Sequence, residues 1–154
     1  MFEQLSRVET DRVAVVGMGA EGRGDDAAGL EVARRLDSTQ GLHAIEGGVA
    51  PENFTGVVRD FEPTLVVLVD AIEFGGEPGD VAVIDSDDLR SGSVSSHTPT
   101  PSMLLTYLER ETGGTAVLVG IQPATIDPGD SVSPAVETAI EETVAVIERL
   151  CAVE

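Results

Sequence analysis

The stretch Leu65-Val66-Val67-Leu68-Val69 is the feature of the sequence that most restricts the fold. Five consecutive aliphatic residues leave no polar face for water, so a strand built from them has to be covered on both sides. The run Val13-Ala14-Val15-Val16 has the same character and predicts a second buried strand. Strands covered on both faces are typical of parallel sheets with helices packed on each side. The sequence therefore predicts an α/β protein with the 64–69 strand near the centre of its sheet.

Segments with helical periodicity alternate with the strands. Each has apolar residues three or four positions apart, and three of them have a proline in the first turn, where its missing N–H costs nothing. The predicted helices cover residues 26–36, 51–61, 101–112 and 134–151, and Ser133 is expected to cap the last of them. With strands at 13–16, 42–45, 64–69 and 115–121, the predicted architecture is a three-layer α/β/α sandwich of the phosphorylase/hydrolase-like kind.

One strand is expected to run against the others. The turn 75–79 is too short to hold a crossover helix, so the strand 81–84 that follows it should be antiparallel and lie at an edge of a five-stranded sheet. Residues 85–98 are polar and are predicted to form a loop. No repeat or linker divides the chain, which is interpreted as one domain over residues 1–154 with a core from 12 to 151.

The charge balance excludes several classes of partner. The chain has 28 acidic residues and only nine basic ones, all of them arginine, which gives a net charge of −19. Such a surface repels nucleic acids and anionic membranes, and its scattered acids are interpreted as a halophilic adaptation. The N-terminal residues lack an apolar leader segment, and the longest aliphatic run is too short to span a bilayer. We therefore expect a cytoplasmic protein.

Polar side chains follow the predicted strands at one edge of the sheet, where ligands bind in open α/β folds. Asp25 and Asp26 precede the first helix, Asp70 ends the central strand, and His97 lies in the loop before the third helix. One acid of the 25–26 pair is expected only to stabilise the helix start. A carboxylate such as Asp70 is costly to bury without a partner. Together with Asp26 and His97 it forms a mixed oxygen and nitrogen set that suits a divalent transition metal.

The same loop also fits a nucleotide-binding pattern. Gly17, Gly19 and Gly22 satisfy G-x-G-x-x-G, and Glu46 stands where a ribose-binding acid belongs. A pyrophosphate, however, needs free N–H groups and the positive end of a helix, and two carboxylates at that position would repel it. A nucleotide-binding module is therefore kept as a minor alternative.

The motifs together resemble those of the hydrogenase maturation proteases, the endopeptidases that trim the C-terminal tail of the [NiFe] hydrogenase large subunit. The resemblance runs from about residue 13 to 150 and rests on GMGAEGRGDDAAG, EGG, VDAIEFGGEPGDV, SSH and VGIQPATIDPG…VSPAV. It implies that Asp26, Asp70 and His97 contact a metal and are the catalytic groups of an aspartic-type peptidase.

The resemblance further implies that the enzyme has no intrinsic cofactor. Nickel is supplied by the large-subunit precursor, and a divalent surrogate such as cadmium or zinc can take its place. The chain is expected to act as a monomer. Two positions depart from the family pattern: Ala20 replaces a usual asparagine, and Ala27 replaces a frequent glycine. Loss of the asparagine removes a hydrogen-bonding side chain from the loop. A metal-binding homologue without catalytic activity is the remaining alternative.

Overall fold

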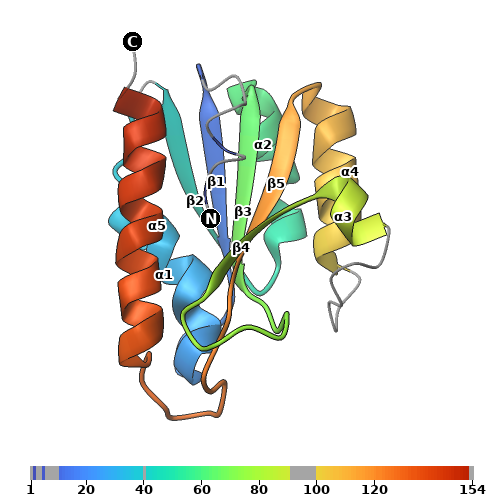
Figure 1. Ribbon diagram of the computed structural model, residues 1–154. Helices are drawn as coiled ribbons and strands as arrows, with labels where there is room; N and C mark the ends of the chain where they lie inside the picture. The colour runs from blue at the N-terminus through green and yellow to red at the C-terminus, as the bar shows by residue number, and fades with distance from the viewer. Residues whose placement is uncertain (1, 3–4, 6–10, 40, 91–99, 153–154) are drawn as a thin grey trace.

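A five-stranded sheet with the strand order β2-β1-β3-β5-β4 forms the middle of the molecule (Figure 1). The computed structural model describes residues 2, 5, 11–39, 41–90 and 100–152. Strands β1, β2, β3 and β5 are parallel, and β4 pairs antiparallel with β5 at the edge, as the short turn before it predicts. The strands are β1 (Val13–Met18), β2 (Leu42–Gly48), β3 (Leu65–Ala71), β4 (Val81–Asp85) and β5 (Thr115–Ile121).

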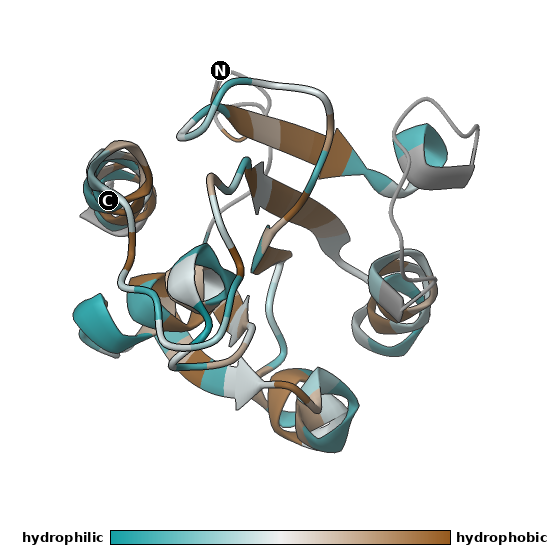
Figure 2. Cartoon of the chain, turned by 90° about the horizontal axis from the view of Figure 1, so that it is seen from below, coloured by the Kyte–Doolittle hydropathy of each residue, from teal (hydrophilic) through white to brown (hydrophobic). Residues whose placement is uncertain are grey.

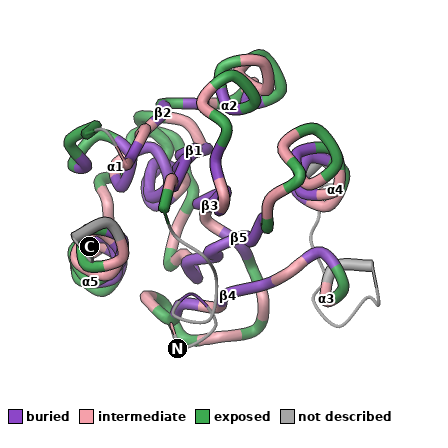
Figure 3. Tube along the Cα trace, turned by 90° about the horizontal axis from the view of Figure 1, so that it is seen from above, coloured by how far each residue is buried: buried purple, intermediate pink, exposed green. Residues whose placement is uncertain are grey.

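Helices cover both faces of this sheet. Alternate side chains of each strand point to opposite faces, and two separate apolar clusters result. One cluster joins the sheet to α1 and α5, the other joins it to α2 and α4, and the strands are the most buried part of the chain (Figures 2 and 3). The helices are η2 (Gly24–Ala27), α1 (Ala28–Arg35), η3 (Pro51–Phe54), α2 (Thr55–Phe61), α3 (Ser86–Arg90), α4 (Thr100–Thr112) and α5 (Pro134–Ala152), where η marks 3₁₀ turns.

The chain leaves the neighbouring strands β1 and β3 in opposite directions along the sheet. From β1 it passes through η2 and α1 to β2 on one side of the pair, and from β3 it passes to β4 at the opposite edge. Neighbouring strands whose connections diverge in this way leave a crevice beyond their carboxyl ends, which lie at the bottom of Figure 1. Both Asp26 and Asp70 follow strands of this pair, so the topology confirms the predicted sandwich and places two candidate residues at one crevice.

Several local predictions were wrong. Strand β2 continues through Gly48 because the register shifts there, leaving Gly47 as an extra residue in a bulge. The predicted loop at 85–98 contains the short helix α3, and residues 91–99 lie outside the described part of the chain. The spacing of apolar residues predicts an inner stripe of Phe54, Val57, Val58 and Phe61 for the 51–61 helix. In the structure Val57 is 43% exposed, whereas Val58 is buried.

Gly29 lets helix α1 approach the sheet closely. A Cβ atom at this position would lie 2.0 Å from the carbonyl oxygen of Val69 and 2.5 Å from that of Met18. Because both obstacles are strand backbone, we expect Gly29→Ala to destabilise the fold by about 3 kcal/mol, as overpacking of a rigid core does. Chemical unfolding followed by circular dichroism measures this loss.

The matched control is Gly56→Ala, which changes the same residue type within helix α2. A Cβ there would meet only the end of the Arg59 side chain, at 3.6 Å. Alanine is the better helix former, so this variant should be as stable as the wild type or slightly more stable. Equal effects at the two glycines would show that close packing of α1 is not what requires Gly29.

Candidate active site at the carboxyl ends of β1 and β3

The connection between β1 and α1 folds back on itself and presents Asp26. Gly19 has a φ of +124°, and a Cβ there would lie 1.8 Å from the backbone oxygen of Asp26. Only glycine accommodates both constraints. The backbone N–H of Ala20 donates a hydrogen bond to Oδ2 of Asp26 at 3.1 Å. The loop thus fixes this carboxylate through backbone groups, within the 3₁₀ turn η2.

Asp26 and Asp70 line one hollow of about 210 Å³. Asp70 is half-buried near the end of β3, and its Oδ1 accepts a hydrogen bond from the N–H of Ala71 at 2.9 Å. The remainder of the lining comes from the ends of β1 and β2, from η3 and from the start of α4. These other residues are Met18, Gly19, Gly48, Val49, Pro51 and Pro101. The structure therefore brings together two of the three predicted site residues.

The surroundings of Asp70 change its protonation. Burial and, to a smaller extent, the negative charge of Asp26 raise the pKa of Asp70 to about 7, while the bond from Ala71 opposes the shift. A carboxylate that is half protonated near neutral pH is unusual and is typical of sites that bind metals or transfer protons. The pKa shift also affects the stability of the fold.

Asp70 should make stability fall as pH rises. Its pKa is near 4 in the unfolded chain and about 7 in the folded one, so the folded state holds the extra proton between these values. Stability is then lost from pH 4 to pH 7 and constant above. The free energy of unfolding of Asp70→Asn, relative to that of the wild type, should therefore increase by about 2 to 3 kcal/mol from pH 5 to pH 8. This follows from roughly 1.4 kcal/mol per unit of pKa difference.

Urea unfolding at both pH values measures this difference, and Asp127→Asn is its control. Asp127 is exposed, so its replacement removes one negative charge from the surface without relieving a buried one. The control should show the same difference from the wild type at both pH values. A pH-independent effect of Asp70→Asn would contradict the raised pKa.

Asp25 has a structural role that the sequence did not reveal. It is fully buried, and its carboxylate accepts hydrogen bonds from the N–H groups of Ala124, Thr125 and Ser133 and from the Ser133 hydroxyl, at 2.7 to 3.3 Å. These partners lie in the connection between β5 and α5, 99 to 108 residues further along the chain. Asp25 thereby fastens that connection to η2, beside Asp26. Stabilisation of the helix start, which was the role predicted for one acid of the pair, does not account for these long-range hydrogen bonds.

His97, the third predicted site residue, lies outside the described residues. Within the ranges that the structure does describe, no group of three His, Cys, Asp or Glu side chains is arranged to hold a metal ion. Asp26 and Asp70 supply two carboxylates, and His97 stays a prediction as the third. The helix α4, whose start lines the hollow at Pro101, begins three residues after it.

The glycine-rich loop is not arranged as a phosphate cradle. The N–H of Gly19 donates to the carbonyl of Gly48 at 2.9 Å, and that of Ala20 donates to Asp26. A Cβ on Gly17 would meet the backbone of Gly29 at 2.2 Å, so this glycine serves the packing of α1. Glu46 forms an ion pair with Arg34 at 3.0 Å. These contacts argue against the nucleotide-binding alternative.

The structure is an α/β sandwich with two carboxylates at the carboxyl ends of neighbouring parallel strands. Proteins similar to this chain belong to one family of proteases. The family model described as hydrogenase maturation protease matches residues 29–150, starting three residues after Asp26. The hydrogenase 3 maturation protease of Escherichia coli K12 is 35% identical, with 65% of each chain covered.

Solved structures agree with this assignment. The crystal structure of a [NiFe] hydrogenase maturation protease, HycI from Thermococcus kodakarensis, has a TM-score of 0.86 at 32% identity and covers 96% of this chain and 98% of its own. The solution structure of the endopeptidase HycI from Escherichia coli has a TM-score of 0.74 at 27% identity, covering 91% and 89%. The chain belongs to the hydrogenase maturation protease family, and it is a peptidase.

Across residues 11–39, 41–90 and 100–152, together with residues 2 and 5, no helix has both the length and the apolar character needed to cross a bilayer.

Proposed function

We propose that this peptidase removes the C-terminal tail of a [NiFe] hydrogenase large-subunit precursor that already carries nickel. The observation that carries the proposal is the shared hollow of Asp26 and Asp70 at the carboxyl ends of two adjacent strands. Two carboxylates with room beside them can contact a metal ion that arrives with the substrate. Membership of the hydrogenase maturation protease family supports the same substrate.

In this proposal the enzyme has no metal of its own. Asp26, Asp70 and His97 contact the nickel held by the precursor, and cadmium or zinc can replace nickel in the contact. Because a metal ion binds the ionised carboxylate, it has to displace the proton that Asp70 holds below pH 7. Because its pKa is raised, Asp70 is largely protonated and uncharged below pH 7 until a cation enters the hollow.

Tail release is the hydrolysis of one peptide bond. The oxygen of a water molecule adds to the scissile carbonyl carbon, the bond from that carbon to nitrogen breaks, and the leaving amine takes up a proton. Nickel can lower the pKa of the water or polarise the carbonyl. In this proposal Asp26 and Asp70, which line one hollow, hold that nickel beside the scissile bond. These roles give the enzyme an aspartic-type site.

Intact mass spectrometry of the precursor tests the reaction. The wild-type enzyme should convert nickel-loaded precursor into two products, the mature subunit and a single tail peptide whose masses sum to that of precursor plus one water. Metal binding without any cleavage would favour the metal-binding homologue. Heat released on titration with NAD or ATP, abolished by Gly19→Val, would favour the nucleotide-binding alternative.

We also propose that the enzyme works as a cytoplasmic monomer with a surface adapted to high salt. Its net charge of −19 makes association of identical copies unfavourable by mutual repulsion. Size-exclusion chromatography with light scattering should give the monomer mass of 16.0 kDa. A dimer mass at low protein concentration would contradict this part of the proposal.

A further inference from the structure

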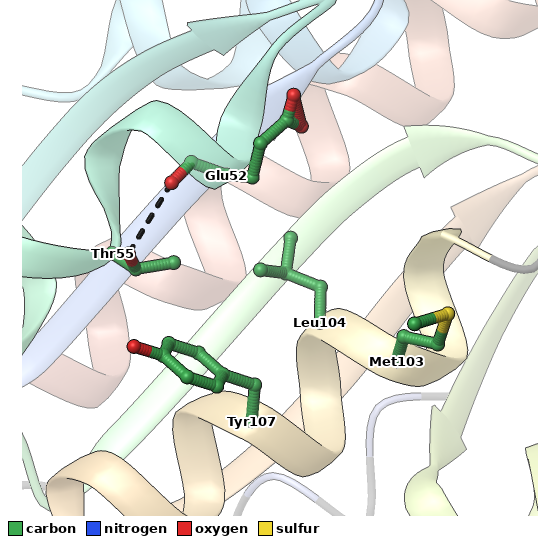
Figure 4. A pocket seen from close by; sticks show the side chains of 5 residues that line it. All are labelled: Glu52, Thr55, Met103, Leu104 and Tyr107. Carbon is green, nitrogen blue, oxygen red and sulfur yellow. Dashed lines mark hydrogen bonds between the residues drawn. The ribbon is translucent and has the colours of Figure 1, made fainter.

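A second, larger hollow opens beside the acidic one. It has a volume of about 560 Å³ and lies between the η3–α2 segment and helix α4 (Figure 4). Leu104 and Tyr107 point from α4 toward the segment that carries Thr55, whose hydroxyl is bonded to the carbonyl of Glu52 (Figure 4). We call this hollow the α4 groove, lined by Glu52, Thr55, Met103, Leu104 and Tyr107.

The α4 groove exposes large apolar side chains. Met103 is 69% exposed and Tyr107 46%, although apolar residues elsewhere on α4 are buried against the sheet. Exposed apolar surface rimmed by polar residues is typical of sites that bind a protein or a ligand. Thr55 and Tyr107 add hydroxyl groups that can bond to a peptide backbone.

The groove continues the proposed cleavage site. Pro51 and Pro101 line the hollow of the two carboxylates, while the next residue, Glu52, and Met103, two positions after Pro101, line the α4 groove. The same two segments therefore form both hollows in succession. From Pro101 to Tyr107 the helix rises about 9 Å, which is the length of roughly three residues of extended chain.

We infer that the α4 groove holds the precursor polypeptide within about three residues of the scissile bond, with an apolar side chain against Leu104, Met103 and Tyr107. This inference rests on the proposed function. A peptidase substrate has to continue beyond the cleaved bond, and the groove is where such a chain leaves the carboxylate pair. Because the enzyme has a net charge of −19 and Glu52 lies on the groove, the bound segment is expected to lack acidic residues.

Kinetics with charged substitutions test the groove. Met103→Glu and Tyr107→Glu should each raise KM for nickel-loaded precursor about tenfold and change kcat less than twofold, since they weaken ground-state and transition-state binding equally. Tyr107→Phe keeps the apolar ring and loses only the hydroxyl, so its KM should stay within about threefold of the wild-type value. Both positions are exposed, so the unfolding midpoint should not move.

Val57→Glu is the matched control. Val57 is an exposed apolar residue of α2, two positions after Thr55 and thus on another face of that helix, and it lines neither hollow. Its KM should stay at the wild-type value. Unchanged KM in both groove variants, with normal cleavage by the wild type, would overturn the groove and leave the proposed function intact.

A photo-crosslinking residue at position 107 identifies the occupant without requiring cleavage. After irradiation with uncut precursor, the crosslink should map to precursor residues next to the processing site. A crosslink to a second copy of the enzyme, or to a remote surface of the precursor, would refute the inference. Failure of the wild type to cleave any precursor would refute the proposed function, while the crosslink still decides the groove.

Discussion

Asp70→Asn is expected to slow tail release by roughly 10³-fold or more, because it removes a charged contact to the metal that activates the water or the scissile carbonyl. Asparagine preserves the shape of the side chain, and its oxygen can still accept the bond from Ala71. The loss should therefore appear in kcat/KM without loss of structure. A discontinuous assay that resolves precursor from mature subunit by mass measures it.

The design of this experiment separates catalysis from folding. Asp70→Asn should be at least as stable as the wild type at pH 8, since it removes a buried charge. Asp26→Asn should lose activity similarly, and Asp127→Asn, which replaces an exposed acid away from the hollow, should keep it. Cleavage by Asp70→Asn within a few-fold of the wild-type rate would contradict the assigned role of this carboxylate.

Asp25→Ala is expected to have the largest effect on stability. The substitution leaves three partly buried N–H groups and one hydroxyl without the carboxylate that accepts their hydrogen bonds. Each such loss costs about 1 to 3 kcal/mol, so we expect a total of about 4 to 5 kcal/mol. This is a large share of the stability of a domain of this size. Chemical unfolding monitored by circular dichroism measures the change.

Graded variants keep this prediction testable even where Asp25→Ala does not fold. Ser133→Ala removes only the hydroxyl bond and should cost about 1 kcal/mol. Asp25→Asn turns an acceptor into a donor facing other donors and should fall between the two. Asp127→Ala, in the same connection but exposed, should change stability by less than about 0.5 kcal/mol. A loss below 1 kcal/mol for Asp25→Ala would contradict the anchoring role.

Hydrophobic pattern predicted most of the fold because it depends on local spacing. The fully buried run at 65–69 is the central strand β3, and the short turn at 75–79 correctly indicated an antiparallel edge strand. The end of β2 was missed because a bulge at Gly47 lets a strand pass through a glycine pair. Val57 was misplaced because neighbouring residues on a helix are turned by about 100° from each other, and spacing alone does not show which of the two valines lies nearer the sheet.

The candidate site was predictable only in part. Asp26 and Asp70 could be paired because the carboxyl ends of parallel strands meet at one edge of a sheet. The partners of Asp25 could not, since they are about a hundred residues away and are mostly backbone groups, which leave no signature in sequence. The α4 groove likewise arises only when η3 and α4 come together.

The substitution of Ala20 for the usual asparagine has a physical explanation in the structure. The contact from this position to Asp26 is made by the backbone N–H, which alanine supplies as well as asparagine does. Gly19, whose backbone conformation and close approach exclude a side chain, is the more constrained neighbour. The orientation of Asp26 thus does not depend on the side chain at position 20.

The most direct test of the account compares nickel-loaded and nickel-free forms of the same precursor. Both are incubated with the wild-type enzyme at pH 8, and tail release is followed by mass over time. Release is expected from the nickel-loaded form alone, and nickel-free precursor should become a substrate once nickel is inserted. Equal release from both forms would contradict the claim that Asp26 and Asp70 act on a metal carried by the substrate.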